Sequence, residues 1–494
     1  MAKDLMCSLL EIERFLLDHR ADDSVTSAFK EVKRALYEHK IKKGGLEAAW
    51  SPSQESNKVS KSNGKSLATN FFHTLFCSCV HRDTAYEDDA MTSSYADSGH
   101  KDTAVVQELV QSPRPRKGWV IGDSRRNVKV NYDSPEEYEK LLAQLGNNWN
   151  VDILALSNFK PVTQRGPIVC VGHALINPVG DRIHPDFNRL LAPVLTMIQD
   201  VYLPNPYHNA LHGACVAHMT AVLTKALGLK ECLTPIEEFA YLIAAIGHDA
   251  GHPGKRSFSV LHELAGKTNA FLRSTQNPLA LIYNDASILE NYHASLVCHI
   301  IRSQEGFFDL FSQQDWESIR KRIIQLVLAT DMMSHFTHVN NVRDRRLSGA
   351  FDHKNNPDDL WLLMVLCIKT ADIGHNFLPW CEHLPWTKSL FDEFHMQGDE
   401  ERLLSIPLLL FFDRTRSADI PDSQLGFFQG FTTPLINELV FVDTKNNYLT
   451  RFLQKNSQDN LDHWKKNSKR QLVDILSDLD KSTEIQDVED ASIT

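Results

Sequence analysis

The chain has 494 residues, of which 42% are hydrophobic and 23% are charged, proportions close to those of an ordinary globular protein. This composition excludes a wholly disordered chain, a collagen and a small disulfide scaffold. The 52 lysines and arginines against 63 aspartates and glutamates give a formal net charge of −11. Because phosphate contacts need clustered positive charge, we expect no nucleic-acid partner.

Cysteine usage indicates a reducing compartment. The nine cysteines are scattered, and Cys215, Cys298 and Cys367 lie in apolar helical segments, as buried thiols do. Asp4 and Glu11 interrupt the first apolar run, which argues against a secretory signal. No window approaches 18 uninterrupted apolar residues, so we expect no transmembrane helix and predict a cytoplasmic location.

The first 132 residues differ in pattern from the rest. Residues 1–50 indicate a hairpin of two amphipathic helices, suited to docking or to forming a homodimer. Residues 51–132 are mostly polar linker, with one short apolar segment at 71–76. Cys77 and Cys79 follow that segment. Two interpretations stay open for them: S-acylation of the pair, or a short buried helix, of which we favour the second.

From about residue 133 onwards, helical periods follow one another and strand alternation is rare. We therefore predict an all-α fold, with one compact multi-helix domain over 133–455. A polar C-terminal tail is expected over 456–494, with one helix at 470–479. Helical segments within the domain are expected at 134–145, 185–200, 208–228, 235–248, 257–273, 285–303, 315–331, 357–373, 386–402 and 423–441.

Histidines and acids gather near the ends of these helices. His208 and His212 are four residues apart, which puts both imidazoles on one helix face. The pair His248–Asp249 ends an apolar helix, where glycines allow the chain to turn so that both side chains reach one ion. Asp331 and Asp372 also end helices. An acid at a helix C-terminus opposes the helix dipole, so these placements favour bound cations.

Two histidines with two aspartates suit zinc or a similar ion. Asp249 has two carboxylate oxygens and could bridge to a second ion held mostly by water, which suits Mg²⁺ or Mn²⁺. Two ions a few Å apart are suited to displacement at phosphorus. By spacing alone the histidine pair could equally be structural, so the metal interpretation rests on the whole group.

Six short motifs that include these residues occur in one order. They are Tyr207–His208–Asn209-x-x-His212, His248–Asp249-x-x-His252–Pro253–Gly254, Leu328–Ala329–Thr330–Asp331–Met332, Ala371–Asp372–Ile373, Gln397–Gly398–Asp399 and Ser423–Gln424–Leu425–Gly426–Phe427. Any one of them alone is a weak signal, but the joint pattern is specific. Over roughly 140–450 it resembles the catalytic domain of the class I 3′,5′-cyclic nucleotide phosphodiesterases.

The resemblance implies two divalent metal ions, zinc in the first site and Mg²⁺ or Mn²⁺ in the second. The implied ligands of the first ion are His212, His248, Asp249 and Asp372. The implied residues that organise the second ion through water, beside Asp249, are His252, Glu290 and Asp331. His208 matches the general acid that protonates the leaving 3′ oxygen.

The resemblance also implies a purine pocket. The implied substrate-binding residues are Tyr207, His375, Leu390, Gln424 and Phe427. Gln424 matches the glutamine that hydrogen-bonds the purine, while Leu390 and Phe427 match the apolar clamp on its two faces. His375 stands where cAMP-selective members commonly have Asn, and His383 where many have Tyr. Both departures resemble the calmodulin-stimulated, dual-specificity branch and some protozoan members, so we expect hydrolysis of both cAMP and cGMP.

The sequence thus predicts metal-dependent hydrolysis of a 3′,5′-cyclic nucleotide to the 5′-monophosphate, ending a cyclic nucleotide signal. A broader HD-type phosphohydrolase acting on another nucleotide would share the metal ligands but would not explain Gln424, Gly426 and Phe427 in register. A catalytically dead sensor would need a lost ligand or acid, and all are present. The predicted partner is a small cyclic nucleotide, and the N-terminal or catalytic-domain helices are candidates for a homodimer interface.

Overall fold

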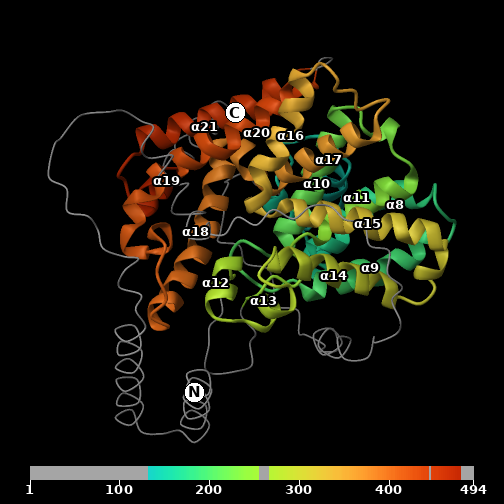
Figure 1. The fold of residues 1–494 in the computed structure, drawn as a ribbon, viewed down its shortest axis with the longest axis horizontal. Helices are drawn as coiled ribbons and strands as arrows, with labels where there is room; N and C mark the ends of the chain where they lie inside the picture. The colour runs from blue at the N-terminus through green and yellow to red at the C-terminus, as the bar shows by residue number, and fades with distance from the viewer. Residues whose placement is uncertain (1–131, 255–265, 444–446, 480–494) are drawn as a thin grey trace, which may run out of the picture. The chain divides into compact units, whose positions relative to one another are not determined.

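The computed structural model describes residues 132–254, 266–443 and 447–479, and these residues form helices and turns without a strand. The all-α prediction is therefore confirmed for them (Figure 1). The expected hairpin at 1–50, the linker with Cys77 and Cys79, and the acidic end of the tail lie outside the described residues.

The helices differ widely in length. Those before residue 250 are α5 (Pro135–Leu142), α6 (Ile153–Leu156), α7 (Lys160–Arg165), α8 (Pro167–Gly180), α9 (Phe187–Val201), α10 (Ala210–Ala226) and α11 (Pro235–Gly247). Those after it are α12 (Asn269–Ser274), α13 (Pro278–Ile282), α14 (Ile288–Ser303), α15 (Gln313–Thr330), α16 (His335–Leu347), α17 (Pro357–Asp372), α18 (Trp380–Leu403), α19 (Ile420–Phe427), α20 (Thr433–Val440) and α21 (Lys455–Lys466). Some of these helices lie outside the segments that periodicity predicted, and the longest of them are α8, α16 and α21.

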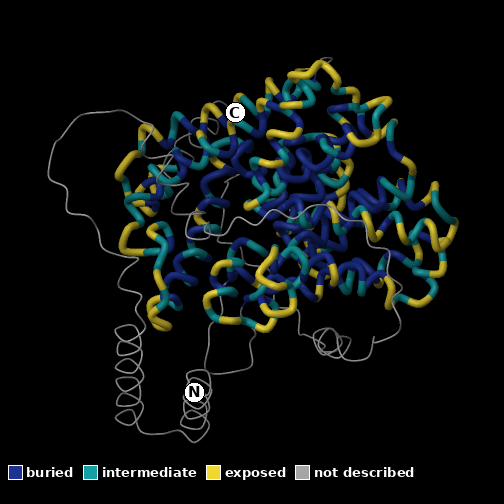
Figure 2. Tube along the Cα trace, in the orientation of Figure 1, coloured by how far each residue is buried: buried dark blue, intermediate teal, exposed yellow. Residues whose placement is uncertain are grey.

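Helices α10 and α11 form the centre of the core. The α11 segment from Glu238 to Gly247 is buried throughout, and α11 packs against α8, α10, α14 and α15. Helix α10 packs in turn against α8 and α17. Figure 2 shows the buried residues concentrated where these helices meet. Because a helix that is apolar on all sides needs neighbours on all sides, the helices that carry histidines and acids are held rigidly from several directions.

The helix expected at 423–441 is present but not uniform. It runs as α19, a π-helical turn (Phe428–Thr432) and α20, without a break. Pro434 stands in the first turn of α20. Proline has no N–H and its ring clashes with the carbonyl four residues earlier, and a π turn relieves that clash. The π turn begins one residue after Phe427 and four residues after Gln424.

The chain beyond residue 455 packs on the helices before it. Leu461 and Trp464 of α21 are buried in a cluster with Leu384 and Phe391 of α18 and with Phe428. The helix expected at 470–479 is present over 472–479 and adds two further buried side chains to that cluster. The described part of the region predicted as a polar tail is therefore joined to α18 and α19 through its own buried face.

Candidate metal and active site

The candidate site lies where helix ends of opposite polarity meet. His212 is in the first turn of α10, and Glu290 is in the first turn of α14. His248–Asp249 follows α11, Asp331 follows α15, and Asp372 is the last residue of α17. The C-termini of α11, α15 and α17 carry partial negative charge, which adds to that of the carboxylates and favours bound cations.

Close packing of α10 on α11 sets the positions of the two histidines. A Cβ on Gly213 would lie 2.8 Å from the carbonyl oxygen of Ile246, so the approach of these helices requires glycine there. The hydroxyl of Tyr202 donates to that same carbonyl at 2.7 Å and accepts from the backbone N–H of Asp249 at 3.3 Å. Gly251, with φ of +76°, then turns the chain away from α11.

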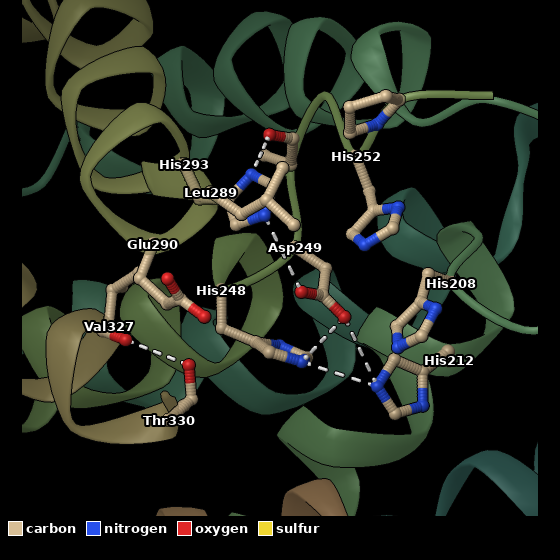
Figure 3. Close-up of polar contacts among 12 residues, drawn as sticks. His208, His212, His248, Asp249, His252, Leu289, Glu290, His293, Val327 and Thr330 are labelled. Atoms are coloured by element: carbon tan, nitrogen blue, oxygen red, sulfur yellow. Dashed lines mark hydrogen bonds and ion pairs between the residues drawn. The ribbon is translucent and has the colours of Figure 1, made fainter. Parts of the chain in front are cut away.

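Four side chains converge on one point: His212, His248, Asp249 and Asp372. The Nε2 atoms of the two histidines are 3.2 Å apart. Each Nε2 lies 3.1–3.4 Å from a carboxylate oxygen of Asp249 and of Asp372. Figure 3 shows His212, His248 and Asp249 pointing toward one another. The resemblance implied that His212 and three helix-end residues would share one ion, and the structure brings these four side chains together.

These distances fit a metal ion. Ligands that surround an ion tetrahedrally at about 2.0–2.1 Å lie about 3.3–3.4 Å from one another, close to the separations found here. His248 donates its Nδ1 proton to the carbonyl of Ala245 at 2.9 Å, so Nε2 is the ring nitrogen left to bind an ion. A backbone carbonyl is the usual partner that orients a metal-binding histidine in this way. The residues present therefore suit a divalent cation.

The two aspartates are ionised. Burial alone raises the pKa of Asp249, but the neighbouring His248 and His212 lower it well below its usual range. Burial likewise raises the pKa of Asp372, and the imidazoles of His212 and His248 lower it below its usual range. Two anionic carboxylates in a buried site need positive charge close by; the neighbouring histidines supply it here, and a divalent cation could supply it when bound.

A second acidic group lies beside the first. Asp331 accepts from the Ser287 hydroxyl at 2.8 Å, and Glu290 accepts from the Asn269 amide at 2.9 Å. Burial, and next the negative charge of Asp331, raise the pKa of Glu290 to about 8. His293 donates Nδ1 to the carbonyl of Ala250, which leaves its unprotonated Nε2 facing Asp249 at 3.7 Å. Two acceptor atoms face one another there, an arrangement that suits water or a cation between them.

His208 is paired with a residue that the sequence did not single out. Its Nδ1 lies 2.5 Å from a carboxylate oxygen of Glu393, and the other carboxylate oxygen accepts from the backbone N–H groups of Tyr207 and His208. Burial lowers the pKa of His208, but Glu393 more than offsets this and raises it to about 9. Burial raises the pKa of Glu393, and His208 brings it down to about 2. The imidazole is therefore held protonated with Nε2 available.

The ring of His252 stacks on the ring of His208. Its ring centroid lies 4.3 Å from that of His208, nearly parallel to it, and its Nδ1 is buried without a hydrogen-bond partner. Burial, and then the positive His208, lower the pKa of His252 to about 3, so its ring is neutral. The structure thus places His252 against the general-acid candidate as well as beside the acidic groups.

The predicted substrate-binding residues lie just before α10, in the turn after α17, and on α18 and α19. Gln424 is buried and its side-chain oxygen has no hydrogen-bond partner. Phe427 stacks on Phe431 with centroids 5.2 Å apart. Leu390 is half-buried at the edge of the main core. Tyr207 is buried and its ring lies between those of His212 and His375, at 4.7 and 5.8 Å.

His383 is committed to other partners. Its Nε2 accepts from the indole N–H of Trp464 at 2.9 Å, which fixes the remaining proton on Nδ1. That nitrogen lies 3.1 Å from both the carbonyl oxygen and the Nδ1 of His375. Both ring nitrogens of His383 therefore have partners other than Gln424. Trp464 lies in the region that the sequence predicted to be tail, and no motif pointed to it.

Comparisons with known proteins agree with this geometry. Residues 207–451 match the sequence profile of a family described as 3′5′-cyclic nucleotide phosphodiesterase. The chain belongs to this family. It is 35% identical over 294 residues to the dual 3′,5′-cyclic-AMP and -GMP phosphodiesterase beta of Plasmodium falciparum, which covers 59% of this chain and 24% of that protein. It is 30% identical over 339 residues to the human high affinity cAMP-specific and IBMX-insensitive 3′,5′-cyclic phosphodiesterase 8A, covering 64% and 38%.

A solved structure shares the fold. The crystal structure of the phosphodiesterase domain of the RhoPDE fusion protein from the choanoflagellate Salpingoeca rosetta matches with a TM-score of 0.56 and 26% identity. The match covers 67% of this chain and 98% of that one. By contrast, the chain spans only 24% to 50% of the length of the first four curated relatives.

Membership of the phosphodiesterase family implies the use of divalent metal, and the four-residue cluster offers a place for it. Over 132–254, 266–443 and 447–479, the structure contains no helix with the length and apolar character needed to cross a membrane.

Proposed function

We propose that this chain hydrolyses a 3′,5′-cyclic nucleotide to the nucleoside 5′-monophosphate. The proposal is supported by one arrangement above all. A His₂Asp₂ cluster lies beside a histidine that a buried glutamate keeps protonated. Opening of the cyclic phosphate needs a nucleophile at phosphorus and a proton for the leaving 3′ oxygen, and this arrangement provides for both.

We assign the first metal to His212, His248, Asp249 and Asp372, with zinc as the ion suited to two nitrogen and two oxygen donors. We assign the second, Mg²⁺ or Mn²⁺, to Asp249 with water held by His252, Glu290 and Asp331, since these hard cations prefer oxygen ligands. When bound, such ions neutralise phosphoryl oxygens and make water a stronger nucleophile.

His208 is the proposed general acid. Glu393 holds its Nδ1, so Nε2 is the nitrogen that faces a substrate and gives its proton to the departing 3′ oxygen. The same carboxylate accepts two backbone N–H groups, which fix the main chain at Tyr207 and His208. The imidazole is thus oriented through its side chain and its backbone by one buried group.

For the base, we propose that Gln424 hydrogen-bonds the purine and that Phe427 and Leu390 enclose its two faces. Tyr207 and His375 are proposed to line the approach to the metals. Stacking of Phe427 on Phe431 gives that clamp a rigid backing. The names of the relatives include cAMP-specific, cGMP-specific and dual enzymes, so they favour no single base. We propose that both are hydrolysed.

The proposal is tested by measuring turnover of cAMP and cGMP by the purified chain. Asp249→Ala and Asp372→Ala should each abolish activity while far-UV circular dichroism stays helical, because each removes a ligand of the first ion. Asp309→Ala is the matched control, an exposed aspartate after the far end of α14. Near-normal turnover by either site variant in metal-controlled buffer would contradict the metal assignment.

A second arm tests the proton transfer. General acid catalysis contributes about 10²- to 10⁴-fold, so His208→Ala should lose a rate factor of that order on a cyclic nucleotide. The loss should be smaller on an analogue whose leaving group needs no proton. Equal losses on the two substrates would mean that His208 has a structural or metal-binding role instead.

A further inference from the structure

Lys369 is a buried lysine that the proposed chemistry does not yet use. It lies on α17 and is 2% exposed. Lysine is almost never buried to this degree unless its ammonium group is paired. Burial lowers its pKa to about 8, while the negative charges of Asp372, Asp331 and Glu290 act to raise it. The group therefore stays mostly protonated at neutral pH.

The partners of Lys369 are main-chain carbonyls at the end of another helix. Its Nζ donates to the carbonyl oxygen of Ala329 at 2.6 Å and to that of Asp331 at 3.2 Å. The last carbonyls of a helix have no partner within the helix and carry its partial negative charge. The ammonium group thus shares in capping the end of α15 with Ser334, whose hydroxyl donates to the carbonyl oxygen of Asp331 at 2.7 Å.

This contact joins the two acidic groups of the site. Lys369 is three residues before Asp372, so the two share one face of α17. The ammonium group of Lys369 donates to the backbone carbonyl of Asp331. The Asp331 carboxylate in turn accepts from the Ser287 hydroxyl and from the backbone N–H of Met333. A change in the position of Lys369 would therefore alter the separation between the first cluster and Asp331.

The charged and titratable groups that face Lys369 come from four segments. They are Asp372 on its own helix, Glu290 on α14, Asp331 after α15, and His335 and His338 on α16. Burial, and then Lys369, lower the pKa of both histidines. The cation therefore interacts with three acids and two neutral rings.

We propose that Lys369 is a positioning residue for the second cation site: it ties the end of α15 to α17, so that Asp331 stands at a fixed distance from Asp372. This inference rests on the proposed two-cation function. Residues that orient metal-binding groups typically change metal affinity about 10- to 100-fold when they are replaced. A loss of this order in the second site alone is the expected signature.

The experiment measures metal binding without turnover. Metal-stripped full-length chain is loaded with one equivalent of Zn²⁺ and titrated with Mn²⁺, with free Mn²⁺ followed by electron paramagnetic resonance. Lys369→Met should weaken Mn²⁺ binding about 10- to 100-fold with zinc retained. The matched control is Lys267→Met, which removes a lysine that is also 2% exposed but pairs with Glu400 on α18. The control should bind Mn²⁺ as the wild type does.

Equal Mn²⁺ affinity in Lys369→Met and the wild type would overturn the inference while leaving the proposed function intact. If that variant does not fold, Lys369→Gln is measured in the same way. Its side chain is uncharged and one atom shorter, so weaker Mn²⁺ binding is again expected, and unchanged binding again overturns the inference. A wild type that hydrolyses no cyclic nucleotide and binds no Mn²⁺ would instead overturn the proposed function, and the inference with it.

Discussion

Glu393 and His208 show how one buried carboxylate can set the protonation of a catalytic group. Desolvation alone would leave the imidazole neutral at pH 7 and unable to donate a proton. The carboxylate reverses this balance, because it is held ionised by His208 itself and by backbone N–H groups. The pair then behaves as one unit, in which each partner keeps the other charged.

The first prediction at this scale is a shift in pH dependence. A general acid is active in its protonated form, so activity falls as pH rises through its pKa. Glu393→Gln removes the charge that raises the pKa of His208, so the decline in kcat/KM should begin at lower pH than in the wild type. Asp392→Asn, a change at the exposed neighbour that pairs with Lys388, should leave the profile unchanged. An unaltered alkaline limb in Glu393→Gln would argue against His208 as the acid.

The second prediction concerns the choice of base. The amide of Gln424 can donate and accept, and adenine and guanine present opposite patterns at their six-position edge. His383 cannot hold that amide in one orientation, because Trp464 and His375 occupy both of its ring nitrogens. Both cAMP and cGMP should therefore be hydrolysed. Gln424→Ala should weaken the binding of both nucleotides, and Phe427→Ala should raise KM for both.

Parallel measurement of kcat/KM for the two nucleotides decides this. A preference above a hundredfold corresponds to about 2.7 kcal/mol of discrimination. A difference of that size would mean that a group other than His383 orients Gln424, and the argument from the occupied ring nitrogens would fail.

Among the helices, periodicity located most of the long segments, including α11, which is buried over Glu238–Gly247, but it missed α8, α16 and α21. Helix α8 is buried on nearly all sides, from Pro167 to Gly180, so it has no polar face to mark its period. Helix α16 is the reverse, since only His335, Val339 and Val342 are buried and its stripe is thin. Helix α21 is similarly polar, with a buried face of four residues that includes Leu461 and Trp464.

The residues of the site likewise divide into those that the sequence could indicate and those that it could not. Metal-ligand candidates could be found from sequence because His and Asp at helix ends are chemically distinctive, whereas Glu393 lies mid-helix in a run where a glutamate is ordinarily exposed. Only the fold shows that its carboxylate is buried against His208. Trp464 was missed for a related reason, because its partner is 81 residues away. Local spacing carries no information about such contacts.

Helix α21 gives a prediction at the scale of the element. Ending the chain at residue 454 removes Trp464 and the amide of Asn460, which donates to the carbonyls of Asn376 and Leu378 at 3.1 and 2.8 Å. Loss of one buried tryptophan side chain alone costs about 3–5 kcal/mol. Thermal unfolding should therefore occur at much lower temperature, or the protein should be insoluble. A chain ending at residue 479 is the control and should unfold as the full chain does.

If the chain ending at 454 unfolded within a few degrees of the full chain, α21 would not contribute to the stability of the catalytic region. The result would then support a boundary near 455, as the composition of the sequence alone suggested.

At the scale of the whole molecule, the described helices share one large hydrophobic core. Buried side chains from Tyr138 to Leu453 make one continuous cluster, and every candidate site residue lies between Tyr207 and Phe427. Tyr132 and Tyr138 both pack on the ring of Phe159. A boundary before Tyr132 would therefore preserve the contacts that begin the core.

A chain that begins at residue 131 should consequently fold and retain the turnover number of the full chain on a cyclic nucleotide. A chain that begins at residue 150 is the matched comparison. It lacks α5 and Trp149, whose fully buried indole donates to the carbonyl of Phe377 at 3.1 Å, close to the turn that carries His375. Loss of such a side chain costs about 3–5 kcal/mol, so this shorter chain should unfold at lower temperature and lose activity. Thermal unfolding and turnover of both chains measure this. An insoluble or inactive chain from residue 131 would show that the first 130 residues are needed for the catalytic region to fold or work.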